Sequence, residues 1–209
     1  MAWDYIIAGG GTAGCVLANR LSADGRSSVL LLEAGGSDRT PIVRIPAGEI
    51  FAIASPRYNW NYDAEPDPSL YDRVTKWPGG RVLGGSSSIN GMIYFRGQRE
   101  DYDDWASLLG NTGLWSYEDV LPYFKRMESN EFGASEYHGD SGPLTASHVP
   151  TPHTVAKAFI EAGVEIGIPH NPDLNGERQE GIGPLQGSIR RGRRHNTGLA
   201  YLRPARRRS

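Results

Sequence analysis

An α/β fold is predicted for this chain of 209 residues from three segments near its start. The run "DYIIAGG" (4–10) is apolar with no polar alternation, which is typical of a buried parallel strand. The run "TAGCVLANRLSADG" (12–25) has the apolar spacing of a helix and ends in a glycine that stops it. The run "SSVLLLEAGG" (27–36) repeats the buried-strand pattern. The three segments therefore predict one β–α–β unit.

The turn between the first strand and the helix carries the pattern Gly9-x-Gly11-x-x-Gly14. The first glycine permits the tight turn, the second lets the backbone approach a pyrophosphate, and the third allows close packing of helix and strand. The helix N-terminus adds free N–H donors for the anion. Glu33 ends the second strand, where a carboxylate can accept hydrogen bonds from a ribose. This Rossmann-like unit predicts a dinucleotide site and disfavours NADP, but it does not choose between FAD and NAD.

The rest of the chain is less regular. Residues 37–78 are rich in Pro, Asp, Tyr and Trp without a sustained period, so we expect an extended excursion with little regular structure. Amphipathic helices are predicted over 99–110, 116–129 and 153–167. In the second of these, Ser116 can cap the helix and Asp119 takes the acid position of a capping box. Residues 168–209 are expected to be rich in loops as far as "TGLAYLRPA".

A second loop of glycines and serines, "GGRVLGGSSSING" (79–91), is too flexible for the interior of a helix or strand. The longer run "GRVLGGSSSINGMIYFRGQREDYD" (80–103) resembles the first signature of the glucose–methanol–choline (GMC) oxidoreductases, FAD enzymes that oxidise alcohols. The matching positions are Gly80, Arg81, Leu83, Gly84, Gly85, Ser86, Ser87, Ile89, Asn90, Tyr94 and Gly97. "NWNYDAEP" (59–66) is similar to the family's segment near the FAD-covering lid. The likeness extends over nearly the whole chain and is closest to choline-dehydrogenase-like members.

The resemblance implies a Rossmann-like FAD-binding domain of the GMC or glucose-oxidase type, with the beginning of an α+β substrate domain, both incomplete. Residues 1–105 would form the first part of the FAD-binding domain, with 37–78 as a lid-like excursion. Residues 106–190 would form part of the substrate-binding domain. Residues 191–209 would return toward the FAD-binding domain, where the sequence stops. We therefore expect uncovered apolar surface and a marginally stable or aggregation-prone chain.

The resemblance also implies which residues contact the cofactor. They are Gly9, Gly11, Thr12, Ala13, Gly14, Glu33, Trp60, Arg81, Val82, Gly85, Ser86, Asn90, Gly91 and Ile93. Thr12 and Ala13 would lie by the pyrophosphate, Glu33 on the ribose, and Val82 and Ser86 on the dinucleotide. Asn90, Gly91 and Ile93 would flank the flavin ring. Some members attach FAD covalently to a histidine just before the asparagine, but this chain has Ile89 there, so we expect non-covalent FAD.

The implied reaction is FAD-dependent oxidation of a small-molecule alcohol, with hydride transfer to the flavin N5 in a full-length member. The family's catalytic histidine is expected beyond Ser209, so no residue of this chain is assigned as catalytic. A catalytically inactive FAD-binding fragment, or one piece of a split enzyme, is the alternative. An NAD-dependent Rossmann enzyme is a third reading, in which the second glycine loop would have no role.

Several other functions are not indicated by the sequence. No stretch is long and apolar enough to span a bilayer, and no targeting segment is visible. The single cysteine, Cys15, is expected in the core and fits a reducing cytoplasm. The five histidines are scattered, so no metal site is expected. Residues 190–209 hold eight arginines and no acid, but no aromatic platform accompanies them, so nucleic acid is not an expected partner.

Overall fold

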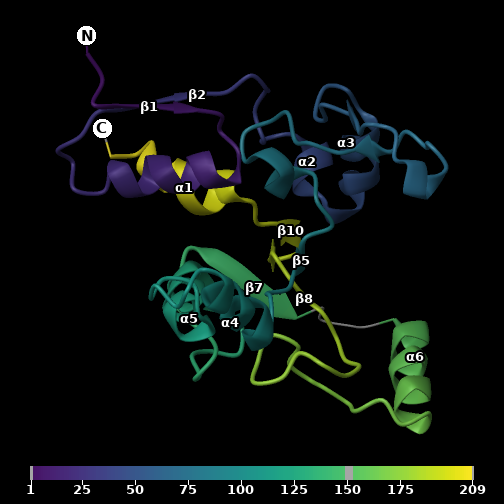
Figure 1. The fold of residues 1–209 in the computed structure, drawn as a ribbon. Coiled ribbons are helices and arrows are strands. Elements are labelled where there is room, and N and C mark those ends of the chain that lie inside the picture. Colours follow the sequence, from purple (N-terminus) through teal and green to yellow (C-terminus); the bar gives the residue numbers. More distant parts are fainter. Residues whose placement is uncertain (1, 149–152, 209) are drawn as a thin grey trace. The chain divides into compact units, whose positions relative to one another are not determined.

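The computed structural model describes residues 2–148 and 153–208. The chain divides into two compact units (Figure 1). The first unit runs up to Met92 and resumes at Arg190, and the second runs from Ile93 to Ile189. The helix predicted at 99–110 thus belongs wholly to the second unit. The division into FAD-binding and substrate-binding parts, with its boundaries at 105 and 190, stays a prediction.

The first unit begins with the predicted β–α–β unit. Its elements are β1 (Tyr5–Ala8), α1 (Thr12–Leu21) and β2 (Val29–Leu32). The two strands pair in parallel from Tyr5 opposite Val29 to Ala8 opposite Leu32, and α1 packs on both of them (Figure 1). The helix buries a stripe of small residues that includes Gly14, Cys15 and Ala18, which lets it approach the strands closely. The parallel unit is confirmed, and so is the core position of the cysteine.

The expected burial of the two strands was wrong. Only Ile7 of β1 is buried, at 9% exposure, whereas its neighbour Ile6 is 65% exposed. Ile7 faces α1, since a Cβ built at Gly14 would lie 3.4 Å from its Cγ2. Alternate side chains of a strand point to opposite faces, so Ile6 belongs to the face away from the helix. This two-stranded sheet is therefore covered on one face, which leaves apolar strand residues exposed.

The segment 37–78 has more regular structure than expected. It contains α2 (Pro41–Arg44), η1 (Pro46–Gly48), α3 (Glu49–Ala54), β3 (Tyr62–Asp63), η2 (Pro68–Leu70) and β4 (Lys76–Trp77). These elements are too short to show a period in sequence. A side-chain cap begins α2, where the Thr40 hydroxyl accepts from the N–H of Val43 at 3.5 Å. A core of Val43, Ala52, Tyr58, Val82 and Ile89 joins this segment to the second glycine loop.

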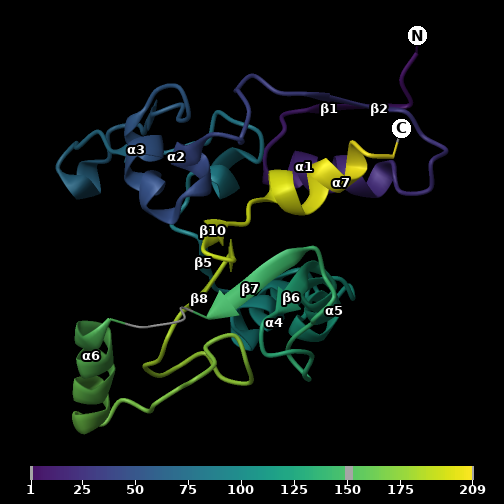
Figure 2. The same cartoon turned by 180° about the vertical axis from the view of Figure 1, so that it is seen from behind.

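The C-terminal segment of the first unit packs against α1. It starts with β10 (Arg193–Arg194), which pairs with β9 (Ile189–Arg190). The π-helical turn η4 (Gly198–Leu202) and the short α7 (Arg203–Ala205) follow and lie beside α1 (Figure 2). The amide of Asn19 donates to the carbonyl of Tyr201 at 2.8 Å. This hydrogen bond links η4, near the C-terminus, to α1.

The second unit combines a small sheet with helices. The sheet has the order β5-β8-β7-β6, with β6 and β7 parallel and the other neighbours antiparallel. Its strands are β5 (Ile93–Tyr94), β6 (Glu128–Asn130), β7 (Leu144–His148) and β8 (Gln186–Gly187). The helices α4 (Arg99–Leu108), α5 (Tyr117–Met127) and α6 (Thr154–Glu165) confirm the three predicted ones. Ser116 and Asp119 form the expected capping box.

No helix within the described ranges has both the length and the apolar character needed to cross a membrane.

Candidate functional site

The three glycines of the first loop have different surroundings, as their assigned roles require. Gly9 has φ +96°, a left-handed conformation that glycine adopts without strain. A Cβ at Gly14 would overlap the carbonyl oxygen of Gly9, so only glycine fits where the helix meets the turn. At Gly11, in contrast, the nearest atom to an added Cβ is 3.9 Å away. The loop therefore leaves open space at Gly11, the position expected to approach a pyrophosphate.

The start of α1 offers N–H donors next to this space. No side chain caps the helix, and no acid lies in its first turn. Thr12 and Ala13 begin the helix and are exposed. The first N–H groups of a helix have no partner within the helix, and the helix dipole favours an anion there. The residues present thus fit a diphosphate group.

Glu33 is held in place by two backbone donors. One carboxylate oxygen accepts from the N–H of Gly10 at 2.7 Å, and the other accepts from the N–H of Gly35 at 2.7 Å. Each carboxylate oxygen has a second lone pair, so both can still accept from ribose hydroxyls. Glu33 also lines a hollow of about 650 Å³ together with Leu31 and Leu83. The acid is therefore fixed beside space that a nucleoside can enter.

The second glycine loop is docked directly on the first. The N–H of Gly84 donates to the carbonyl of Gly10 at 2.8 Å. Gly85 has φ +55°, and a Cβ there would lie 2.6 Å from the Cα of Gly11. Two loops about seventy residues apart in sequence thus touch backbone to backbone, which only glycines allow.

The three serines of the second loop have separate roles. They form the short η3 (Gly85–Ser88). Ser87 donates to the carbonyl of Gly84 at 2.6 Å, and Ser88 donates to the carbonyl of Leu83 at 2.7 Å, so both hydroxyls are used within the protein. Ser86 is exposed, and its hydroxyl accepts from the N–H of Gly80 at 3.1 Å without donating to any of the described residues. Among the three, Ser86 is the one that can still donate to a ligand.

Other predicted site residues lie around this loop. Arg81 places its guanidinium over the ring of Trp60, 4.7 Å from the centroid, and both side chains are exposed. Val82 is completely buried in the core, so any contact it makes with a cofactor must use its backbone. Gly91 is exposed, and a Cβ there would lie 3.4 Å from the carboxylate of Glu49. All the predicted site residues except Ile93 lie in the first unit, whereas Ile93 begins the second.

Sequence reasoning missed the polar residues that support the second loop from beneath. Arg194, Asn196 and Thr197 are buried, and each hydrogen-bonds to the loop. The amide of Asn196 donates to the Ser88 hydroxyl at 2.7 Å, and the N–H of Thr197 donates to the Ser87 hydroxyl at 3.1 Å. The sequence shows these residues only as part of a basic, polar run, "RRHNT", which carries no signal of its partners.

The second unit contains a buried ionic cluster. Glu128 is completely buried and accepts hydrogen bonds from Tyr94, Arg96 and His138. The other ring nitrogen of His138 lies 2.9 Å from the carboxylate of Asp173. Burial alone would lower the pKa of His138, but the hydrogen bonds to Asp173 and Glu128 outweigh it and raise the pKa to about 9. His138 is thus held as a cation within the protein core.

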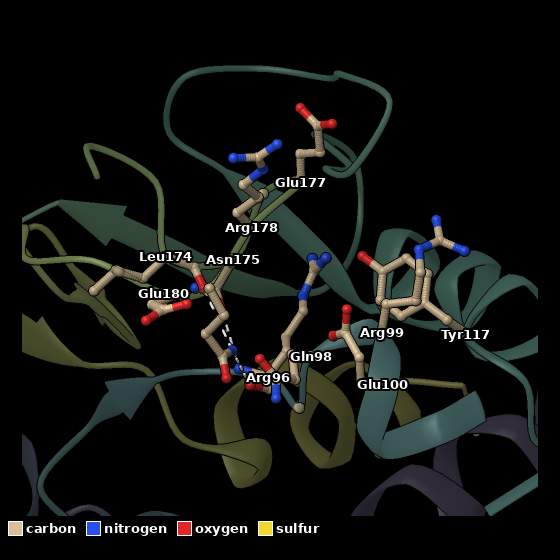
Figure 3. A pocket seen from close by; sticks show the side chains of 13 residues that line it. Arg96, Gln98, Arg99, Glu100, Tyr117, Leu174, Asn175, Glu177, Arg178 and Glu180 are labelled. Carbon is tan, nitrogen blue, oxygen red and sulfur yellow. Dashed lines mark hydrogen bonds between the residues drawn. The ribbon is translucent and has the colours of Figure 1, made fainter. Parts of the chain in front are cut away.

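A cavity of about 310 Å³ also lies in the second unit, and Figure 3 shows its lining. The backbone of Arg96 is hydrogen-bonded to two side chains here. Its N–H donates to Oδ1 of Asn175 at 2.8 Å, and its carbonyl accepts from Nε2 of Gln179 at 2.6 Å. Positively charged arginine side chains and negatively charged glutamate side chains both line the cavity. None of the residues predicted to bind the cofactor lines this cavity.

Among the described residues, neither of the buried histidines His138 and His195 is suited to take up a proton at neutral pH. His138 is paired with carboxylates on both sides. Burial lowers the pKa of His195 to about 4, and the charges of Arg190 and Arg44 add to this effect. Within the described residues, no group of three or more His, Cys, Asp or Glu side chains could hold a metal ion.

Comparison with known families decides the relationship, since residues 3–209 match the GMC oxidoreductase family. The chain belongs to the GMC oxidoreductases. FAD is the cofactor of these enzymes, and this chain corresponds to their N-terminal, FAD-binding part. The resemblance seen in the sequence is therefore confirmed, together with the fold class.

Named GMC relatives are similar over nearly the whole chain but are much longer. An oxygen-dependent choline dehydrogenase of Rhizobium meliloti is 48% identical over 98% of this chain, and one of Brucella anthropi is 45% identical over the same share. This chain spans 37% of the length of each. The structure of pyridoxine 4-oxidase from Mesorbium loti superposes with a TM-score of 0.91 at 35% identity, covering 100% of this chain and 41% of that one. Formate oxidase from Aspergillus oryzae matches with a TM-score of 0.83 at 26% identity, covering 95% of this chain and 36% of that one.

Proposed function

We propose that this chain binds FAD non-covalently across its two glycine loops and forms the cofactor-binding part of an enzyme that oxidises a small alcohol. The observation that carries the proposal is the docking of the second loop on the first, through Gly84 and Gly10 and through Gly85 and Gly11. The first loop alone supplies the pyrophosphate contact that NAD and FAD sites share. A second loop that continues from it suits a cofactor that extends further, as a flavin dinucleotide does.

Each part of the site has a distinct task in this proposal. The first-turn N–H groups of Thr12 and Ala13 bind the diphosphate, and Glu33 accepts from the ribose hydroxyls. Ser86 donates to the dinucleotide from the second loop. Asn90 and Gly91 lie at the exposed end of that loop, where they would contact the flavin ring. When bound, FAD supplies the acceptor for a hydride from the alcohol carbon.

Non-covalent binding is supported by the residue before Asn90. Ile89 is almost fully buried, at 2% exposure, and packs in the core with Val82 and Tyr58. An aliphatic side chain has no nucleophilic atom with which to form a bond to a flavin.

The alcohol substrate is proposed from the relatives, two of which are named for choline and one for pyridoxine. A small primary alcohol is the common chemistry of these names. The family's catalytic histidine would lie beyond Ser209, in a C-terminal portion outside this chain. A cytosolic location is part of the same proposal and is supported by Cys15, a free buried thiol.

Binding of FAD without turnover is the second candidate function. It is favoured by the surroundings of His138 and His195, since His138 is paired with carboxylates and burial lowers the pKa of His195 to about 4, which makes it a weak proton acceptor. An NAD-dependent enzyme is disfavoured, because the second loop would then hold no part of the cofactor.

The visible spectrum of the purified chain tests these readings. The chain is incubated with FAD, freed of excess cofactor by gel filtration, and then mixed with choline without oxygen. The proposal expects retained flavin bands and release of the flavin on acid precipitation. Bleaching by choline would show alcohol oxidation by the chain itself, and bands that persist would support binding without turnover. A folded, colourless chain that binds NAD would overturn the flavin assignment.

A further inference from the structure

Arg194 is a buried cation with no role in the sites predicted from sequence. Its exposure is 1%, and burial lowers the pKa of its guanidinium. Burying a charge is costly unless hydrogen bonds replace its water. The Nε donates to the carbonyl of Val43 at 3.0 Å, and Nη1 donates to the carbonyl of Asn90 at 2.6 Å. Arg194 therefore connects α2 with the end of the second glycine loop.

The same guanidinium also holds the side chain of Asn90. Nη1 of Arg194 donates to Oδ1 of Asn90 at 2.7 Å, and the N–H of Met92 donates to the same oxygen at 3.1 Å. Arginine and a backbone N–H can only donate, so the atom that faces them must be the amide oxygen. Rotating the amide by half a turn would set its NH₂ against two donors. The orientation of Asn90 is therefore fixed by hydrogen-bond chemistry.

This orientation leaves one group of Asn90 free. The residue is exposed, and its Nδ2 makes no hydrogen bond within the described part of the chain. Its two N–H groups are thus available as donors at the end of the loop. The edge of an isoalloxazine ring carries carbonyl oxygens and ring nitrogens, which are acceptors that such a donor suits.

We propose that Arg194 is a positioning residue for the flavin: it turns the Asn90 amide so that Nδ2 donates to an acceptor on the isoalloxazine edge. The inference rests on the proposed binding of FAD. It adds that the specificity of the second loop for a flavin ring depends on a buried guanidinium more than 100 residues later in the chain. Arg194 itself touches neither the adenosine end of the site nor the first loop in any hydrogen bond to the described residues.

The test compares FAD with ADP, which carries the adenosine and diphosphate but no flavin. Dissociation constants for both are measured for the wild-type chain and for Arg194→Met, Arg194→Lys, Asn90→Ala and the double variant Arg194→Met/Asn90→Ala. Arg193→Met is the matched control, since Arg193 is the exposed neighbour in β10. The shape of the visible flavin band is recorded for each FAD complex.

Loss of one neutral hydrogen bond corresponds to roughly a 2- to 12-fold weaker affinity. We expect Arg194→Met and Asn90→Ala each to weaken FAD by about this factor, to leave ADP unchanged and to alter the flavin band in the same way. The double variant should be no weaker than either single variant, and Arg194→Lys should recover part of the loss. Arg193→Met should match the wild type.

Other results overturn the inference. Equal weakening of FAD and ADP by Arg194→Met would assign Arg194 a structural role only. An unchanged FAD affinity in folded Asn90→Ala would remove the flavin contact even if Arg194→Met fails to fold. If the wild-type chain binds FAD and both Arg194→Met and Asn90→Ala bind it as tightly, this inference alone is wrong. If the folded wild-type chain binds no FAD, the proposed function is wrong as well.

Discussion

The charge on His138 makes the stability of the second unit dependent on pH, and the size of the effect follows from its surroundings. Its side chain is 8% exposed and lies between the carboxylates of Glu128 and Asp173. These two groups raise its pKa from 6.5 to about 9 against the opposing effect of burial. A pKa unit corresponds to about 1.4 kcal/mol, so the protonated form contributes about 3 kcal/mol to stability.

The direction of the pH effect follows from the raised pKa. The pKa of His138 is higher in the folded protein than in the unfolded chain, where it is about 6.5. Its protonated form therefore contributes its full stabilisation of the folded state below pH 6.5. This stabilisation is lost as the pH rises from there through about 9. Despite the opposing effect of burial, hydrogen bonds to His138 hold the pKa values of Glu128 and Asp173 below their usual ones, so their contributions are lost only as the pH falls into the acidic range.

Urea unfolding checks this prediction. The free energy of unfolding is measured below pH 6.5 and above pH 9 by tryptophan fluorescence, to which Trp105 and Trp115 contribute from the second unit. We expect the wild type to lose about 3 kcal/mol between the two conditions and His138→Gln to lose little. The same pH dependence in both proteins would refute the assignment of the effect to His138.

Three further changes have defined outcomes. Glu128→Gln should destabilise the second unit by about 3–5 kcal/mol in urea unfolding, because it leaves Arg96 buried without a counter-charge; a loss below 1 kcal/mol would contradict a buried pair. Gly14→Ala should lower the melting temperature, because its Cβ overlaps the carbonyl of Gly9, and an unchanged melt would oppose this packing. Ile6→Ser should reduce binding of a hydrophobic dye and change stability by no more than about 0.5 kcal/mol, and a larger loss would show that Ile6 is buried.

Local patterns predicted the parts of the structure that are built locally. The β–α–β unit follows from apolar runs of the right length on either side of a glycine turn, and the helix at Ser116 follows from its capping box. The short helices α2 and α3 were missed, because four to six residues do not establish a period. Burial of the strands was overestimated, because an apolar run shows that a strand can be covered but not what covers it.

The supporting side chains of the site could not be predicted for a different reason. Arg194 appears in the sequence as one arginine of a basic tail, yet it is more buried than most apolar residues. Its partners Val43 and Asn90 lie 151 and 104 residues away, so no local spacing connects them. The same holds for His138 and Asp173, which are 35 residues apart. The residues predicted to face the cofactor come from a family resemblance, which says little about the side chains packed behind them.

The most direct test of the two-loop site compares the affinity for FAD of the wild-type chain with that of Gly11→Ala, which adds one methyl group at the first loop. An alanine at Gly11 meets no protein atom within 3.9 Å and suits its φ of −73°, so Gly11→Ala should melt like the wild type. Its Cβ would fill the space assigned to the diphosphate, and losing one hydrogen bond to a charged group corresponds to roughly 10- to 100-fold in affinity. Gly36→Ala, at a glycine with open space around it, is the control. Quenching of FAD fluorescence should give tight binding for the wild type and Gly36→Ala and at least tenfold weaker binding for Gly11→Ala; equal affinities in all three would contradict a diphosphate bound at this loop.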